Sequence, residues 1–224
     1  MAAGPILTDL KYVKETGQEL EILNFHKSFP ITCRARVESI APDGITFIVQ
    51  PPGSVCLVDQ EQTILLSRGL PEAVRARILA FDLATGMLKI GEMSYIHAHF
   101  GDRKIARVQP EGHMPVEIEC EGHIFSGELA DVSLSGIGVL VAEAGFQKEQ
   151  EIVVTLPLPS EPVALPGKIL NITGQDGKQR LSVGFTRNAQ EIALVMRYVR
   201  DRRTEILAEI EQMYQRALQA QENR

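Results

Sequence analysis

Apolar and polar side chains alternate in short segments through the first part of the chain. The clearest case is residues 31–38, where every second residue is apolar: Ile31, Cys33, Ala35 and Val37. This alternation predicts a strand with one buried face. Further strands are predicted at 45–49, 54–58, 62–67, 74–82 and 87–94, with turns at Pro42-Asp43-Gly44 and Ala84-Thr85-Gly86. Residues 8–24 predict a short helix and then a strand, and the whole region favours a small barrel or sandwich.

A second series of predicted strands follows His97-Ala98-His99-Phe100-Gly101-Asp102, which breaks the alternation and indicates a linker. The strands are expected at 107–109, 116–120, 123–134, 138–141, 151–156, 163–172 and 179–185. Glu121-Gly122 and Asp176-Gly177 stand where hairpin turns are needed, and glycine suits the positive φ of such turns. We therefore expect a second all-β unit, which would protect its edges by closing into a barrel.

The period of the pattern changes at residue 188. Apolar residues recur there in alternating steps of four and three, interrupted by Arg203: Ile192, Met196, Val199, Ile206, Ile210, Met213 and Ala217. This is a heptad seam on a long helix, with Asn188 as N-cap and Glu191 completing a capping box. A helix over residues 189–220 would be about 48 Å long, too long to pack on one small barrel. The seam therefore predicts a homodimer through Ile192, Met196, Val199, Ile206, Ile210 and Met213.

Together these patterns predict a mainly β fold. It consists of two small antiparallel β-barrels, the first of them split-barrel-like, followed by a long C-terminal α-helix. The expected segments are a first barrel domain at residues 1–96, a linker at 97–107, a second barrel domain at 108–187 and the helix at 188–224. Two domains also suit a chain of 224 residues.

Composition narrows the functional classes. The formal net charge of −6 argues against a general nucleic-acid binder, so an anionic ligand would need a local cluster of positive charge. The three cysteines, Cys33, Cys56 and Cys120, are far apart and favour a reducing compartment. Residues 1–10 have no signal-peptide pattern, and no apolar run is long enough to span a membrane. We therefore expect a cytoplasmic protein with no membrane insertion.

Two short motifs carry the candidate chemistry. Arg103 and Arg107 are four residues apart, and 24 residues later comes Asp131-x-Ser133-x-x-Gly136. The planar fork of arginine matches a phosphate or the O6/N7 edge of guanine with two hydrogen bonds, whereas Asp131 could accept from N1 and N2 on guanine's other edge. Ser133 adds a hydroxyl group, and Gly136 lets the backbone pass close to a ligand. The pair of motifs predicts a pocket for a guanine-containing dianion.

Both motifs, in this order and followed by β-strands and a helix, resemble the PilZ domain, a bacterial receptor domain for cyclic diguanylate. The resemblance covers Asp102 to about Arg203. It implies that Arg103, Arg107, Asp131, Ser133 and Gly136 contact cyclic diguanylate, with no metal or other cofactor. It also implies a signalling role that acts on a protein partner.

Two departures from the family pattern affect the details. Ile137 separates Gly136 from Gly138, where the family often has two consecutive glycines. Asp102 stands where family members often carry another arginine, and its charge favours one bound ligand molecule over a stacked pair.

The first domain is similar in layout to the amino-terminal barrel of flagellar-brake PilZ proteins. This similarity implies that it serves as an output or docking surface. Ligand capture by the linker arginines would then reorient the two domains. Candidate partners are the flagellar motor or the polysaccharide synthesis machinery, in motility or biofilm formation.

Other functions have weaker support. His97, His99, His113 and His123 could suggest a zinc site, but no cysteine or carboxylate completes a ligand set at a recognisable spacing. An enzyme is not expected, because the chain has no G-x-S-x-G, H-E-x-x-H or P-loop motif. The main alternative is an interaction or scaffold protein of the same fold that binds no nucleotide and dimerises through its C-terminal helix.

Overall fold

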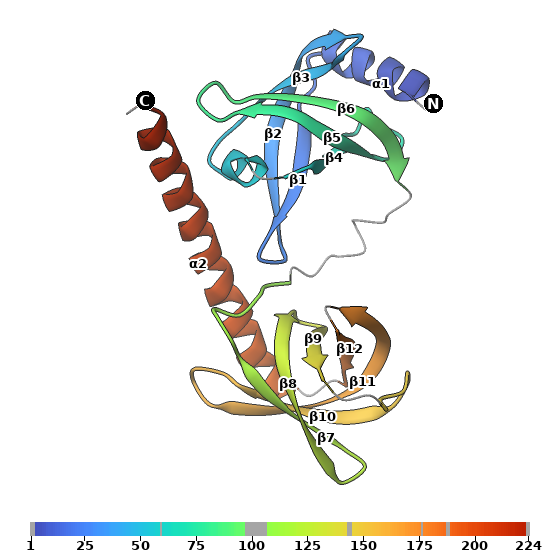
Figure 1. Ribbon diagram of the computed structural model, residues 1–224, viewed down its shortest axis with the longest axis vertical. Helices are drawn as coiled ribbons and strands as arrows, with labels where there is room; N and C mark the ends of the chain where they lie inside the picture. Colours follow the sequence, from blue (N-terminus) through green and yellow to red (C-terminus); the bar gives the residue numbers. More distant parts are fainter. Residues whose placement is uncertain are drawn as a thin grey trace. The chain divides into compact units, whose positions relative to one another are not determined.

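The computed structural model describes residues 3–58, 60–96, 107–142, 145–175, 177–186 and 189–222. Contacts group them into two units. The second unit contains Lys27–Phe29 and the described part of residues 102–205, and the first unit contains the remainder. Each unit holds one closed antiparallel barrel, and a helix ends the described chain (Figure 1). The predicted fold class, two β-barrels followed by a C-terminal helix, is confirmed.

The first barrel follows the helix α1 (Ala3–Glu15), and its strands have the order β1-β2-β3-β6-β5-β4. They are β1 (Leu20–His26), β2 (Phe29–Ala41), β3 (Gly44–Val49), β4 (Gln62–Leu66), β5 (Ala73–Asp82) and β6 (Met87–Ile96). The predicted alternation is confirmed in β2, where Ile31, Cys33, Ala35 and Val37 are buried. The expected helix before the first strand is also confirmed, although α1 begins earlier than residue 8.

The strand predicted at residues 54–58 is wrong. Residues Gly53–Leu57 form a 3₁₀ helix, η1, in which Ser54, Val55, Cys56 and Leu57 are all buried. A strand places successive side chains on opposite faces, so four consecutive buried residues do not suit a strand with one exposed face. The short apolar run does not by itself distinguish the two structures.

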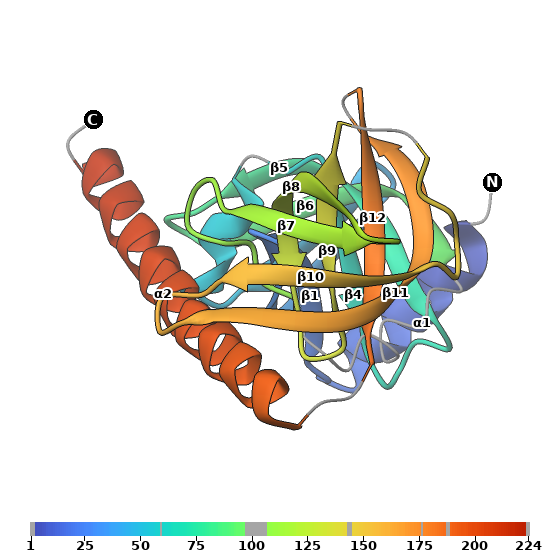
Figure 2. The same cartoon turned by 90° about the horizontal axis from the view of Figure 1, so that it is seen from below.

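The second barrel has the strand order β10-β11-β12-β9-β8-β7 (Figure 2). Its strands are β7 (Pro115–Cys120), β8 (His123–Val132), β9 (Gly136–Val141), β10 (Glu151–Pro157), β11 (Pro162–Gln175) and β12 (Lys178–Phe185). The segment predicted as a strand at 107–109 forms only an isolated antiparallel bridge, between Val108 and Val132. In the turn at Glu121-Gly122, Gly122 has the expected positive φ, and Glu121 also has a positive φ. A second turn is predicted at Asp176-Gly177. Gly177 has a positive φ there, and Asp176 lies outside the described residues.

The C-terminal helix α2 spans Ala189–Glu222, close to the predicted 189–220. The proposed N-cap, Asn188, lies outside the described residues. No helix in the described part of the chain is long and apolar enough to cross a membrane.

The middle of the predicted heptad seam of α2 is buried within a single chain. Val199, Ile206 and Ile210 are buried, whereas Met196 and Met213 are exposed. The guanidinium of Arg203, which interrupts the seam, lies over the ring of Phe29 at 5.5 Å from its centroid. Because the middle of the seam is covered without a partner helix, its length alone does not require a dimer. The homodimer stays a prediction. Of the seam residues named for it, Met196 and Met213 are exposed in the single chain.

Candidate ligand-binding site

Asp131 lies at the end of β8, where the pairing with β9 is irregular. The register shifts between Leu129 and Asp131, so that Asp131 is opposite Gly138. Such a β-bulge re-aims the side chains beside it and is common next to binding sites. The Asp131 side chain is only 8% exposed, so its carboxylate needs compensating partners.

Two arginines provide that compensation. Arg180, on β12, donates a short hydrogen bond from Nη2 to Oδ2 of Asp131. Arg107 places Nη1 3.8 Å from Oδ1, within ion-pair range but beyond a hydrogen bond. The Arg180 side chain is 21% exposed and that of Arg107 is 45% exposed. Arg107 is therefore the more exposed partner, and Arg180 is the more buried one.

The segment after Arg107 is attached to the barrel by backbone hydrogen bonds. Val108 and Val132 exchange two N–H···O bonds, each 2.9 Å long, and both side chains are fully buried. This bridge brings Arg107, from the first motif, to Asp131, from the second, as the sequence predicted. Arg103 lies outside the described residues, so its placement stays a prediction.

Ser133 and Gly136 close a tight turn between β8 and β9. The backbone N–H of Ser133 donates to the carbonyl of Gly136 at 2.9 Å, and its hydroxyl donates to the same oxygen at 3.0 Å. An added Cβ at Gly136 would overlap the carbonyl oxygen of Val183 on the adjacent strand β12. Both residues therefore have a structural role in the turn, and the Ser133 hydroxyl keeps acceptor capacity for a ligand.

A cavity of about 60 Å³ lies between these residues. Small-molecule pockets usually enclose about 300–1,000 Å³, so a dinucleotide would not fit inside it. A ligand of that size would have to lie over the outer face of the barrel. The cavity is lined by Arg107, Asp131, Ser133, Ser135, Gly136, Ile137, Leu170, Ser182, Val183 and Gly184.

Two residues of this site were missed by the sequence reasoning. Arg180 comes from β12, 49 positions after Asp131, and only the pairing of β12 with β9 brings it there. Gly138 faces the pair directly: a Cβ on it would lie 2.5 Å from Arg180 Nη2 and 2.9 Å from Asp131 Oδ2. Only one feature of the sequence points to Gly138. It begins the predicted strand that pairs with the strand carrying Asp131.

Two histidines considered for a metal site have other neighbours. His113 Nδ1 lies 2.9 Å from Glu128 Oε1, and this hydrogen bond, together with Lys178, lowers the pKa of the Glu128 carboxyl group. His123 packs edge-on against Phe125 with 6.5 Å between ring centroids. His97 and His99 lie outside the described residues, within which no cluster of three potential metal ligands occurs.

Comparison with known proteins supports the resemblance seen in the motifs. Residues 102–201 match the family model described as "PilZ domain". An uncharacterised protein of Aquifex aeolicus (strain VF5) is 26% identical over 121 residues, which cover 54% of this chain. The aligned region spans only 59% of that relative's own length.

Solved structures that are similar to this chain include two c-di-GMP complexes. One is YcgR from Escherichia coli (13% identity, 92% of this chain and 93% of that chain, TM-score 0.46). Another is MrkH from K. pneumonia (12% identity, 92% and 95% coverage, TM-score 0.47). A third similar structure is the Bacillus subtilis inhibitor of motility MotI/DgrA (14% identity, 84% and 96% coverage, TM-score 0.45).

Proposed function

The chain is a PilZ domain protein, with the domain at residues 102–201, and we propose that it is a bacterial receptor for cyclic diguanylate. The ligand would bind on the outer face of the second barrel. The proposed location is the cytoplasm, in agreement with three buried cysteines that form no disulfide. Binding, with no catalytic step, would be the function of the domain.

The observation that carries the proposal is the buried Asp131 carboxylate between two arginines. A carboxylate suits the N1 and N2 hydrogens of guanine, and Arg107, which is partly exposed, suits a phosphate or the O6/N7 edge. Each carboxylate oxygen can accept more than one hydrogen bond, so Asp131 can hold Arg180 and a guanine together. Ser133 and Gly136 would complete the contact surface beside it.

We place Arg103 with Arg107 in a segment that closes over the ligand. The cavity on the barrel is too small to enclose a dinucleotide, so the enclosing groups have to come from elsewhere in the chain. A good bidentate arginine contact contributes about 1–3 kcal/mol. One ligand molecule is expected, because the charge of Asp102 opposes a second set of phosphates.

The proposed response is a change in the arrangement of the domains at 1–96 and 108–187, joined by the linker at 97–107. Residue 109, two positions after Arg107, accepts a hydrogen bond from Arg202 of α2 and donates one to Lys27. Movement of Arg107 would thus be transmitted to α2 and to the β1–β2 turn. The partner that reads this change, in motility, biofilm formation or polysaccharide synthesis, is a protein still to be identified.

Calorimetry tests the receptor proposal. Titration of the full chain with cyclic diguanylate should give saturable heat in the micromolar range or below, and Arg103→Ala and Arg107→Ala should each weaken binding about tenfold or more. Arg197→Ala is the matched control, because Arg197 is an exposed arginine of the same unit outside the cavity lining. No heat from the parent protein at about 50 µM ligand would refute the proposal.

A second candidate is a PilZ-fold interaction protein that binds no nucleotide. It is favoured by the fact that Arg180 and the turn at Ser133 already satisfy the polar groups of the motif. In this case dimerisation through α2 would use the exposed seam residues Met196 and Met213. Light scattering would then show a dimer mass for the parent and a monomer mass for the M196E/M213E variant.

A further inference from the structure

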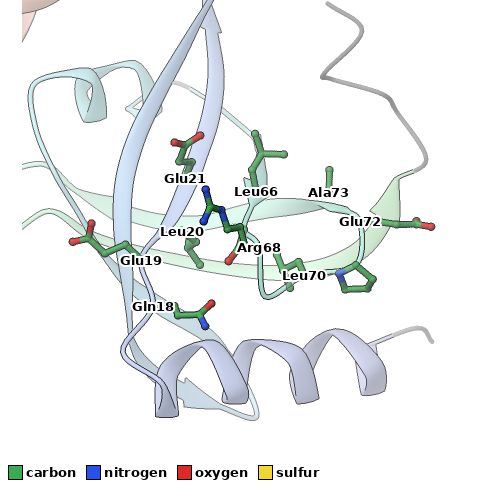
Figure 3. A pocket seen from close by; sticks show the side chains of 11 residues that line it. Gln18, Glu19, Leu20, Glu21, Leu66, Arg68, Leu70, Glu72 and Ala73 are labelled. Atoms are coloured by element: carbon green, nitrogen blue, oxygen red, sulfur yellow. The ribbon is translucent and has the colours of Figure 1, made fainter.

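A groove in the first barrel has an apolar floor. It has a volume of about 800 Å³ and lies where the connection from α1 enters β1 and where β4 turns into β5 (Figure 3). Leu20 and Leu70 are buried beneath it, and Pro71 is exposed at its edge. The full lining is Gln18, Glu19, Leu20, Glu21, Leu66, Ser67, Arg68, Leu70, Pro71, Glu72 and Ala73.

The rim of the groove is acidic. Three carboxylates, Glu19, Glu21 and Glu72, surround a single cation, Arg68, which gives the lining a formal net charge of −2. The strand order β1-β4-β5 separates them: Glu19 and Glu21 lie at β1, Arg68 follows β4, and Glu72 precedes β5. Figure 3 shows the carboxylates of Glu21 and Glu72 on different sides of the Arg68 side chain.

The charges of Glu19, Glu21 and Arg68 are weakly paired within the described part of the protein. Among the described residues, the side chains of Glu21 and Arg68 make no hydrogen bond or ion pair. The carboxylate oxygens of Glu19 lie 3.9 Å from Arg34 Nη1 and 3.7 Å from Arg36 Nε. Both arginine side chains are well exposed. Exposed pairs at such distances contribute little and exchange readily with an external cation.

We propose that this groove binds a basic segment of a protein partner. An apolar side chain of the segment would pack on Leu20 and Leu70, and flanking lysine or arginine side chains would pair with the glutamates of the rim. The acidic rim repels phosphate groups, which disfavours nucleotides, nucleic acids and anionic lipid surfaces. The groove is also open at the surface, which suits a length of chain better than a small enclosed molecule.

The proposal does not depend on cyclic diguanylate, because every residue of the groove belongs to the first unit. It can therefore be tested without that ligand, and its failure would leave the receptor proposal intact. The probe is an acetylated and amidated KLRLK peptide added to the isotope-labelled full chain. Amide chemical shifts are followed by NMR.

We expect saturable shifts confined to residues 18–21 and 66–73. The E19Q/E21Q variant should weaken peptide binding about fivefold, because two of the three carboxylates are removed. The matched control is E117Q/E119Q, which removes two exposed glutamates at the same spacing on β7 of the second barrel. It should leave the affinity unchanged.

The Arg68→Gln variant provides a test in the opposite direction. It removes the one cation of the lining, and Arg68 is exposed, so folding should be preserved. We expect KLRLK to bind about threefold more tightly to this variant. The proposal is overturned if no saturable shift occurs at millimolar peptide, if shifts map elsewhere, or if an ELELE peptide binds equally well.

Discussion

Arg180 Nη2 donates to Oδ2 of Asp131, so the acidic residue of the motif is held by a strand far from it in sequence. The Asp131 side chain is nearly buried, and Arg180 is its closest cation. This contact fixes the direction of the carboxylate before any ligand arrives. Preorganised groups lose less conformational freedom on binding than groups that must be ordered by the ligand.

We therefore expect Arg180→Ala to weaken cyclic diguanylate binding about tenfold, although Arg180 belongs to neither motif. Calorimetry on the full chain measures the effect. Lys178→Ala is the control, because Lys178 is a cation on the same strand β12, lies outside the cavity lining, and pairs with Glu128 at 3.5 Å rather than with Asp131. Tighter binding by Arg180→Ala would show instead that Arg180 competes with the ligand for Asp131.

Alanine substitution is expected to have different effects on stability and ligand affinity at Gly136 and Gly138. At Gly136 the added methyl group would overlap the backbone oxygen of Val183, which cannot move without opening the pairing of β9 with β12. Gly136→Ala should therefore lower the free energy of unfolding by about 3 kcal/mol. Urea unfolding followed by circular dichroism measures this change.

At Gly138 the nearest atoms to the added methyl group are the ends of the Arg180 and Asp131 side chains. These ends can shift, so Gly138→Ala should cost less stability than Gly136→Ala and should instead displace the ion pair. We expect a loss of cyclic diguanylate affinity of about tenfold with a nearly unchanged unfolding midpoint. Equal destabilisation by the two substitutions would contradict this assignment.

The sequence predicts the part of the site that depends on local spacing. Arg107 and Asp131 come together because one segment bridges the end of a strand, and both belong to recognisable motifs. Arg180 could not be found in this way, because its position depends on how β12 closes against β9. A shift of one residue in that register would turn the side chain to the other face of the sheet.

The same distinction applies to the fold. Alternation in β2 depends only on a buried and an exposed face, and it was predicted correctly. The η1 segment is a short apolar run, as a buried strand would be. Its 3₁₀ conformation depends on how it packs in three dimensions. The seam of α2 was recognised from its period, but a period does not tell which surface covers Ile206 and Ile210.

Arg202 connects α2 to the segment that carries Arg107. Its side chain is 2% exposed, Nε donates to the carbonyl of Gln109 at 3.1 Å, and Nη1 pairs with Glu205 at 2.8 Å. Arg202→Ala should lower the free energy of unfolding by about 2 kcal/mol, because the substitution removes a buried side chain and its part-buried hydrogen bond to Gln109. It should also speed amide exchange at Val108, whose bridge to Val132 adjoins Gln109.

Hydrogen exchange read by mass spectrometry checks this prediction. Arg200→Ala is the matched control, since Arg200 lies two positions away on α2 and is well exposed beside Asp201. It should leave exchange at residues 107–109 unchanged. Equal effects of the two substitutions would show that the loss of positive charge on the helix, and not the Gln109 contact, is responsible.

The folding stability of the protein should depend on pH through two buried thiols. Burial raises the pKa of Cys33 to about 12, with a further contribution from the nearby Cys56, and burial raises the pKa of Cys56 to about 11. An unfolded cysteine has a pKa of about 8.5. Above that pH the unfolded chain loses thiol protons that the folded chain keeps, so the folded state binds more protons. Its stabilisation is complete below about pH 8.5 and is lost as the pH rises toward 11–12.

We therefore expect the urea midpoint of the parent protein to fall between pH 8.5 and 10.5, and to fall less steeply in the C33A/C56A variant. The two proteins are compared by the slope of the urea midpoint against pH, because alanine in a buried site lowers stability at every pH. Tyr95, whose pKa burial and Asp9 raise to about 12, contributes a fall of the same sign that both proteins share. Parallel curves for parent and variant would show that the two thiols do not titrate differently in the folded and unfolded states.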